Sequence, residues 1–220
     1  MPFEELLPMI GTGIIDTLYM TLLSTFFAYL LGLPIGIGLV YYAKDGLHPN
    51  AIVHRIFNIV VNVFRSIPFL ILMMWVQPVT RKIVGTTLGS PAAIVPLVIS
   101  AAPFVGRMVE QSLREVDRGV VEAAVSMGAL HRQIIGRVFL GESLPSLING
   151  LAISMTTILG YSAMAGIIGG GGLGALAINY GFYRYESQVM NITIVFLVLI
   201  VQIIEWIGKR SSMAMDKRRK

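Results

Sequence analysis

Apolar residues gather in long blocks along this chain, and short basic segments separate the blocks. A helix that crosses a bilayer needs about 20 mostly apolar residues, because each residue rises about 1.5 Å and backbone polar groups must bond within the segment. Five stretches meet this condition, with approximate ranges 14–42, 56–79, 91–113, 138–168 and 189–208. The pattern predicts an all-α polytopic membrane protein of about five transmembrane helices, forming one transmembrane domain over residues 1–220.

The composition also favours a membrane protein over a water-soluble one. Hydrophobic residues make up 55% of the chain and charged residues 13%, with a mean hydropathy of +0.75. Soluble domains carry about 25% charged residues. Residues 1–8 contain Glu4 and Glu5 and lack the basic start of a cleaved signal peptide. We therefore expect the first apolar block to be retained.

The basic residues predict the orientation, since short loops rich in lysine and arginine remain in the cytoplasm. Of the 17 lysines and arginines, only Arg81, Lys82 and Arg184 fall on one side of the five predicted spans. The N-terminus is therefore expected outside and the C-terminus inside, with the basic tail 217–220 as an anchor beside anionic lipid. The positive charges do not gather on one face, which argues against a nucleic-acid partner.

Several kinds of site chemistry lack the residues they need. The chain has no cysteine, and its histidines, His48, His54 and His131, have no carboxylate cluster nearby, whereas a catalytic zinc usually takes three protein ligands. No G-x-x-x-x-G-K-[ST] phosphate-binding loop is present. We therefore predict that the chain is not an enzyme and binds no metal or cofactor of its own.

Helix-disturbing residues fall inside the predicted spans. Four prolines are expected to interrupt and bend their helices, because each removes a backbone donor. They are Pro34, Pro68, Pro96 and Pro103. Gly32, Gly36 and Gly38 in the first span have two interpretations: they let another helix approach closely, or they reflect the ordinary abundance of glycine in membrane helices.

The longest predicted cytoplasmic connection, residues 114–137, carries a helical pattern. Its apolar stripe consists of Val120, Val121, Ala124 and Met127. Asp117 can supply the start signal, and Gly128 suits a left-handed residue that ends the helix. From the pattern alone, such a helix lies either on lipid or against its own helix bundle.

The same segment contains a family signature. Glu122-Ala123-Ala124, three further residues and Gly128 resemble the E-A-A-x-x-x-G motif of the permease subunits of bacterial ABC importers. In that family the loop forms a coupling helix that docks on a separate ATPase subunit. The resemblance implies that Glu122 makes polar contacts with the ATPase, that Ala123 and Ala124 permit close packing, and that Gly128 makes the turn. Met127 is expected to belong to the same docking surface.

One position departs from the family pattern. An aliphatic residue ten positions after the glycine and a following Leu-Pro are usual; Val138 and Leu140 fit, but Gly141 stands where proline is expected. Leu144-Pro145 follows four residues later. The departure concerns the bend into the fourth span more than the docking role.

Other segments resemble the permeases of methionine ABC importers in particular. These are NVFRSIPF at 62–69, AAIVPL at 92–97 with AAPF at 101–104, and GYSAM at 160–164 with GGLG at 171–174. The resemblance covers most of residues 62–181. It implies a type I ABC importer permease fold in the bacterial inner membrane, a homodimer, and transport of D- and L-methionine by alternating access. A permease for another small amino acid, or an ion-gradient-driven secondary transporter, remains an alternative.

The resemblance also implies partners. Two cytoplasmic ABC ATPase subunits would bind ATP and Mg²⁺, and a periplasmic or lipid-anchored binding protein would deliver methionine. The run 169–174 would form a periplasmic re-entrant turn, because glycine adopts backbone conformations that other residues avoid, and would help to close the outer end of the pathway. Met164, with Tyr161 one turn earlier, is either a packing residue or part of an apolar gate formed by two subunits.

Arg65 is an unusual residue for a membrane span. It is placed in the inner half of the second span, where an unpaired charge costs about 2.5 to more than 10 kcal/mol. We therefore expect Arg65 either to be paired, with Glu110 or Glu205 as candidate partners, or to snorkel towards the membrane surface. The alternatives are a structural ion pair and a role in the pathway or in conformational switching.

Overall fold

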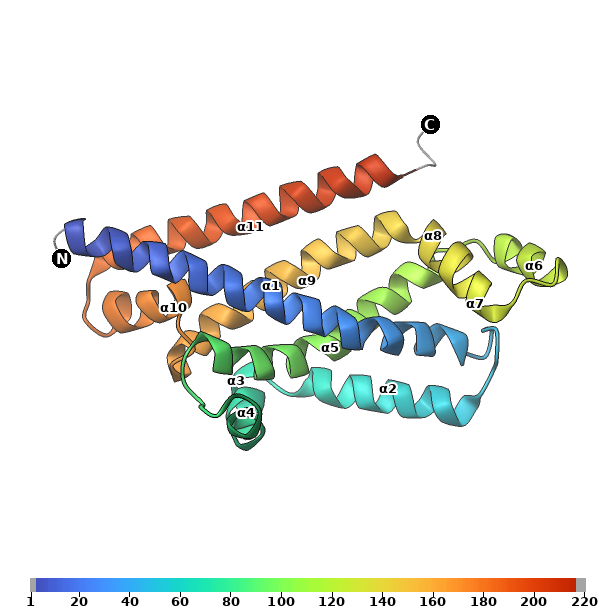
Figure 1. The fold of residues 1–220 in the computed structure, drawn as a ribbon, viewed down its shortest axis with the longest axis horizontal. Helices are drawn as coiled ribbons and strands as arrows, with labels where there is room; N and C mark the ends of the chain where they lie inside the picture. The colour runs from blue at the N-terminus through green and yellow to red at the C-terminus, as the bar shows by residue number, and fades with distance from the viewer. Residues whose placement is uncertain (1–2, 217–220) are drawn as a thin grey trace. The chain divides into compact units, whose positions relative to one another are not determined.

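The computed structural model describes residues 3–216, and the basic anchor expected at 217–220 lies outside them. Every regular element in this part of the chain is a helix (Figure 1). The α-helices are α1 (Phe3–Tyr41), α2 (Ala51–Ser66), α3 (Phe69–Trp75), α4 (Gln77–Val84), α5 (Ser90–Arg114), α6 (Arg118–Ser126), α7 (His131–Gln133), α8 (Leu140–Glu142), α9 (Leu144–Ala165), α10 (Gly172–Leu176) and α11 (Ser187–Met215). Three irregular helices complete the list: π-helical η1 (Ile134–Phe139) and η3 (Ala177–Phe182), and the 3-10 turn η2 (Gly166–Ile168).

The structure contains the expected spans. Among the described residues, four helices are long and apolar enough to cross a membrane, and a fifth span exists if the bent pair α2 and α3 counts as one. The second span, expected over 56–79 with an interruption at Pro68, has this interruption, because α2 and α3 are bent by 101° relative to one another. It is broken at Pro68, whose extended backbone (φ −58°, ψ 134°) ends the helical path, and a residue before proline disfavours the α-conformation.

The other prolines do not interrupt their helices. Pro34 lies inside α1, and Pro96 and Pro103 lie inside α5, each of which runs without a break. The expectation of interruption at these three positions is therefore wrong. A proline removes only one helical hydrogen bond, and in membrane helices local adjustment and neighbouring groups satisfy the freed carbonyl.

The chain divides into two compact units, both assembled from segments far apart in sequence. Unit 1 consists of Met1–Ala28, Ile67–Ala101 and Ser154–Glu205, and unit 2 of Tyr29–Ser66, Ala102–Ile153 and Trp206–Lys220. The division falls within α1, α5, α9 and α11, so each of these helices contributes one part to each unit.

Unit 1 contains the short, buried helix α10. Leu173 of α10 is fully buried and packs with Leu6 and Ile10 of α1 and Val189 of α11, and Figure 1 shows α10 beside the first part of α1. The backbone N–H of Leu173 donates to the hydroxyl of Thr17 at 2.9 Å. The chain between α9 and α11 thus folds back into the unit.

Unit 2 contains a close helix pair. Cβ atoms added at Gly32 and Gly36 of α1 would lie 2.6 Å from side-chain atoms of Val105 and Val109 on α5. The carbonyl oxygen of Gly106 would be only 2.7 Å from the Cβ at position 36. These glycines therefore serve close packing, as small residues do between membrane helices, rather than reflecting glycine abundance alone.

Candidate functional site

The segment around the E-A-A motif forms the short helix α6, with the predicted start and end. Asp117 is the N-cap, and its side chain accepts a hydrogen bond from the backbone N–H of Gly119 at 2.7 Å. Gly128 has a φ of +75°, and its N–H donates to the carbonyl of Val125. A left-handed glycine at this place lets the chain turn sharply after the helix.

The exposed surface of α6 differs from the predicted stripe. Ala124 is buried and Val121 is half-buried, but Val120 is 46% exposed and Met127 80% exposed. The stripe is therefore not one buried face. Glu122, Ala123 and Met127 all remain exposed.

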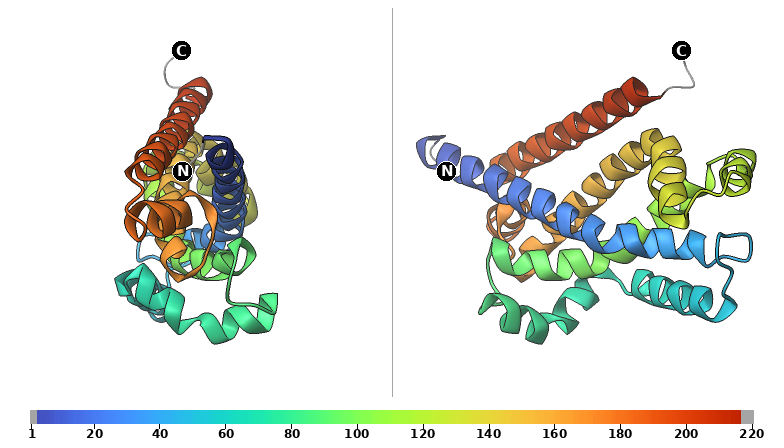
Figure 2. Two further views of the ribbon diagram at one scale, coloured as in Figure 1. Left: turned by 90° about the vertical axis from the view of Figure 1, so that its left-hand side faces the viewer. Right: turned by 45° about the vertical axis from the view of Figure 1, so that its right-hand side comes forward.

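The segment that follows α6, residues 130–134, is held within unit 2 by hydrogen bonds and by burial of Ile134. Figures 1 and 2 show α6 and α7 together beyond the end of α5. Gln133 of α7 accepts a hydrogen bond from the N–H of Leu130 at 2.9 Å. Ile134, which follows, is fully buried, and the ring of His131 is hydrogen-bonded to the hydroxyl of Tyr41 at 2.9 Å.

The bend into the fourth span occurs later than expected. The span was placed over 138–168, but α9 begins at Leu144, and the preceding residues belong to η1 and α8. The α-helix breaks at Ser143 (φ −86°, ψ 1°). Pro145 then sits in the first turn of α9, where proline is well tolerated, so the break lies at 143–145 rather than at Gly141.

Arg65 does not make the expected ion pair. Its side chain and that of Glu205 are exposed, and Glu110 pairs instead with Arg107 at 2.6 Å and with Arg114 at 3.0 Å. Both arginines lie on α5, three residues before and four residues after Glu110, a spacing that places them on one helix face. The predicted pairing of Arg65 with Glu110 or Glu205 is wrong for the described residues.

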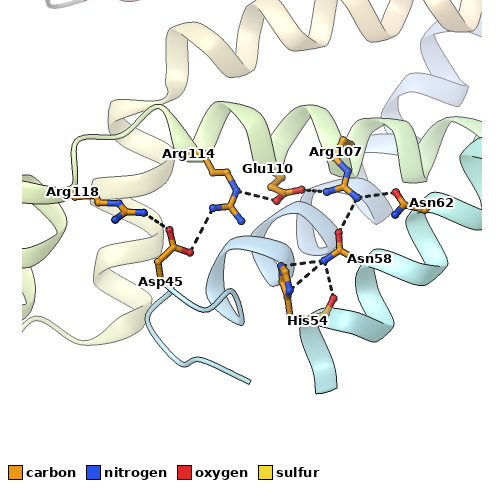
Figure 3. Close-up of polar contacts among 8 residues, drawn as sticks. All are labelled: Asp45, His54, Asn58, Asn62, Arg107, Glu110, Arg114 and Arg118. Carbon is orange, nitrogen blue, oxygen red and sulfur yellow. Dashed lines mark hydrogen bonds and ion pairs between the residues drawn. The ribbon is translucent and has the colours of Figure 1, made fainter. Parts of the chain in front are cut away.

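A polar network surrounds Glu110, and sequence reasoning missed it (Figure 3). Arg107 donates to the side-chain oxygens of Asn58 and Asn62 on α2, at 2.9 and 3.0 Å. At the other end, Asp45 pairs with Arg114 at 3.7 Å and contacts Arg118 directly. The spacing of residues 107, 110 and 114 was a usable signal, but no local pattern links Asp45 to Arg118, 73 residues away.

The predicted gate residues lie on α9 within unit 1. Tyr161 stacks on Phe69 of α3, with ring centroids 4.8 Å apart and planes 4° apart. Met164 is 46% exposed. Tyr161 is therefore a packed residue, whereas Met164 presents a flexible apolar side chain at the surface of the described chain.

The glycine run after α9 adopts the unusual backbone that its composition predicts. Gly169, Gly171 and Gly172 have φ values of +87°, +79° and +74°. Gly89 donates its N–H to the carbonyl of Gly169 at 2.8 Å, and a Cβ at Gly174 would lie 2.4 Å from the backbone of Ala163. The run is packed against neighbouring backbone. No three His, Asp or Glu side chains among the described residues are arranged to hold a metal.

Residues 28–217 match the family model of the binding-protein-dependent transport system inner membrane component. The chain belongs to this family. It is therefore a multi-pass protein of the bacterial inner membrane and a permease component, as the resemblance predicted.

Relatives align with most of this permease. It is 49% identical over 203 residues to the probable D-methionine transport system permease protein MetI of Vibrio cholerae, covering 92% of this chain and 90% of the relative. It is 47% identical over 164 residues to the D-methionine transport system permease protein MetI of Escherichia coli, covering 74% and 75%.

Solved structures share the fold of the permease. An inward-facing structure of the MetNI methionine ABC transporter contains a chain with a TM-score of 0.96 and 44% identity, covering 98% of this chain and all of that one. An amino acid ABC transporter at 19% identity, with a TM-score of 0.78, shares the fold. The predicted type I ABC importer permease fold is confirmed.

Proposed function

We propose that this chain is the permease subunit of an ATP-driven importer that carries D- and L-methionine across the inner membrane. The observation that supports this most strongly is the match over nearly the whole chain to a methionine ABC transporter permease, at 44% identity and a TM-score of 0.96. The resemblance of residues 62–69 and 160–164 to methionine permeases points the same way.

The proposed assembly contains two copies of this chain, two cytoplasmic ATPase subunits that bind ATP and Mg²⁺, and a binding protein on the outer side. An exposed apolar helix supports burial against lipid or a second copy: only 6% of the apolar window of α11 is buried within the described chain. Side chains on α11 such as Val198, Ile203 and Trp206 are 54–64% exposed, and a water-soluble monomer rarely exposes such a surface.

The division into units supports the proposed orientation. Arg81, Lys82 and Arg184, expected outside, belong to unit 1, and every other lysine and arginine among residues 3–216 belongs to unit 2. Unit 2 would therefore carry the cytoplasmic ends of the helices and α6, in keeping with the charge rule for inner-membrane proteins. The N-terminus would lie outside and the C-terminus inside.

The proposed coupling step uses the exposed surface of α6. Glu122 would make a charge-assisted hydrogen bond with the ATPase, Ala123 would allow close approach, and Met127 would add apolar contact. ATP-driven closure of the two ATPases would bring the two α6 helices together and open the pathway outward, and ATP hydrolysis would return it. Met164 from each copy would close the pathway in the opposite state, because methionine fills irregular gaps well.

Reconstitution tests the proposal. The chain is co-expressed with its proposed ATPase partner, placed in liposomes with the binding protein, and supplied with labelled L- or D-methionine. We expect ATP-dependent uptake of both isomers. Uptake of another small amino acid in place of methionine would contradict the substrate, and uptake driven by an ion gradient without ATPase would favour a secondary transporter.

A further inference from the structure

Helix α6 buries little of its surface against the rest of the described chain. Ala124 is its one buried residue in the described chain. An open pocket of about 670 Å³ is lined by Val121 and Val125 of α6 and by Val40, Leu113 and Phe139; Asp45, Arg114 and Arg118 also line it. Along this pocket, displacement of α6 is not passed on by packing, because packing transmits displacement only where atoms are in contact.

The start of α6, by contrast, is held by charge. Arg118, the first residue of α6, contacts the carboxylate of Asp45 in the connection between α1 and α2, residues 42–50. The other oxygen of the same carboxylate lies 3.7 Å from Nη1 of Arg114, the last residue of α5. Asp45 therefore joins α6 to α5 and to the α1–α2 connection.

The contacts continue from Arg114 along α5 to α2 (Figure 3). Arg114 donates from Nε to Oε1 of Glu110 at 3.0 Å, and Arg107 donates from Nη1 to Oε2 of the same carboxylate at 2.6 Å. The side chain of Glu110 is 8% exposed. Arg107 then reaches Asn58 of α2. An unbroken row of ionic and hydrogen-bonded side chains thus connects α6 with α2.

Each carboxylate in this row lies between two arginines, Glu110 between Arg107 and Arg114 and Asp45 between Arg114 and Arg118. Loss of the Asp45 charge leaves Arg118 without an ion-pair partner among the described residues and Arg114 paired with Glu110 alone, so the electrostatic attraction that holds the start of α6 to α5 is lost. Glu110 is shielded from water, whereas Asp45 is 39% exposed, so Asp45 can be changed without opening the interior.

We propose that Asp45 is a positioning residue for coupling: it tethers the start of α6 to α5, so that displacement of α6 passes to α5 and α2 instead of being absorbed by the pocket. The inference rests on the proposed function, in which the ATPase displaces α6. It assigns a role in transmission to a residue outside the E-A-A segment.

The test compares Asp45→Asn with the wild type in the full reconstituted complex. The readout is the number of methionine molecules imported per ATP hydrolysed. We expect ATPase binding to be unchanged and this ratio to fall about three- to fivefold, as for the loss of a partly exposed ion pair that contributes to coupling between sites. Asp45→Glu keeps the charge and is expected to restore at least half of the ratio.

The matched control is Glu115→Gln. Glu115 is an exposed carboxylate three residues before Arg118, and it makes no ion pair with the described residues. The variant removes the same charge from the same region and is expected to keep the wild-type ratio. An equal fall in Glu115→Gln and Asp45→Asn would show a general charge effect and overturn the proposal.

A second readout works without methionine. The chain has no cysteine, so a single Val63→Cys on the exposed surface of α2 can be labelled with a maleimide. When Asp45 is present, adding ATP and vanadate should change the labelling rate of Val63→Cys at least threefold. In the Asp45→Asn variant, the same addition should change the rate less than 1.5-fold, because coupling between α6 and α2 is reduced. An equal change in labelling with Asp45 and with Asp45→Asn would contradict the proposed role of Asp45. Loss of ATPase binding in Asp45→Asn that Asp45→Glu does not restore would also contradict it. A wild-type complex that changes labelling but imports no methionine would instead count against the proposed substrate.

Discussion

Glu122 is the single carboxylate of α6, and its side chain is exposed. We predict that Glu122→Ala weakens co-purification of the ATPase about tenfold or more, since a hydrogen bond involving a charged group contributes about 1.5–3 kcal/mol. The measurement is the ATPase-to-permease ratio after affinity purification at several salt concentrations. Glu115→Ala is the control, and equal binding in both variants would remove Glu122 from the docking surface.

Arg65, at the end of α2, is exposed and makes no ion pair with the described residues. We therefore predict that Arg65→Ala changes the free energy of unfolding by less than about 0.5 kcal/mol, as is usual for an exposed substitution, and lowers methionine uptake. Thermal unfolding and uptake are measured on the same preparation. Unchanged uptake would leave no role for Arg65 in the pathway or in switching.

Asp45 also yields a prediction on pH. Its pKa lies below the usual 3.8 because its carboxylate accepts a hydrogen bond from its own backbone; burial acts in the opposite direction, and Arg114 and Arg118 lower it further. A carboxylate whose pKa is lowered by folding contributes fully above its unfolded value and loses that contribution only as the pH falls through the folded value. The difference between wild type and Asp45→Asn should therefore be constant from about pH 5.5 to 8. A difference that shrinks towards pH 5.5 would contradict this.

At the scale of helices, the close contact of α1 with α5 is the feature most sensitive to substitution. Gly36→Ala would place a methyl group 2.6 Å from Val109 and 2.7 Å from a backbone oxygen. We predict a loss of about 1–3 kcal/mol in the free energy of unfolding, seen as a melting temperature several degrees lower. Gly11→Ala on the same helix meets nothing within 4 Å and is the control; an equal shift in both variants would refute close packing.

The helix pattern was predictable where local signals decide it. The N-cap at Asp117 and the left-handed Gly128 bound α6 as the sequence indicates, because capping depends on neighbouring residues. The break of the second span at Pro68 was predicted, but the same local signal at Pro34, Pro96 and Pro103 wrongly predicted interruptions in helices that stay intact. Only the surrounding bundle distinguishes these prolines.

The candidate site was predictable in part for the same reason. Its exposed motif is local, whereas the pairing of Asp45 with Arg118 joins residues 73 apart. The expectation for Arg65 failed for the same reason. Its charge was placed inside a membrane span and was expected to need a partner, but its side chain at the end of α2 is exposed in the described chain. Long-range ion pairs depend on which helices become neighbours, and hydropathy does not encode that.

At the scale of the whole transporter, Met164 is the residue through which two copies are proposed to close the pathway. We predict that Met164→Ala raises methionine leak in the absence of ATP or lowers the methionine imported per ATP, because a shorter side chain leaves a gap. Met155→Ala, on the same helix, is the control. Leak and coupling that match the wild type would assign Met164 to packing or lipid contact.

The segregation of basic residues between the two units has a consequence for how the protein is made. Lysines and arginines near each span determine its orientation during membrane insertion. Here every connection expected in the cytoplasm contains at least one lysine or arginine. No single arginine decides which way a helix enters the bilayer, so the orientation is redundantly encoded. Substitutions at Asp45, Arg65 or Arg107 should consequently yield correctly inserted protein, and their effects can be read as effects on transport.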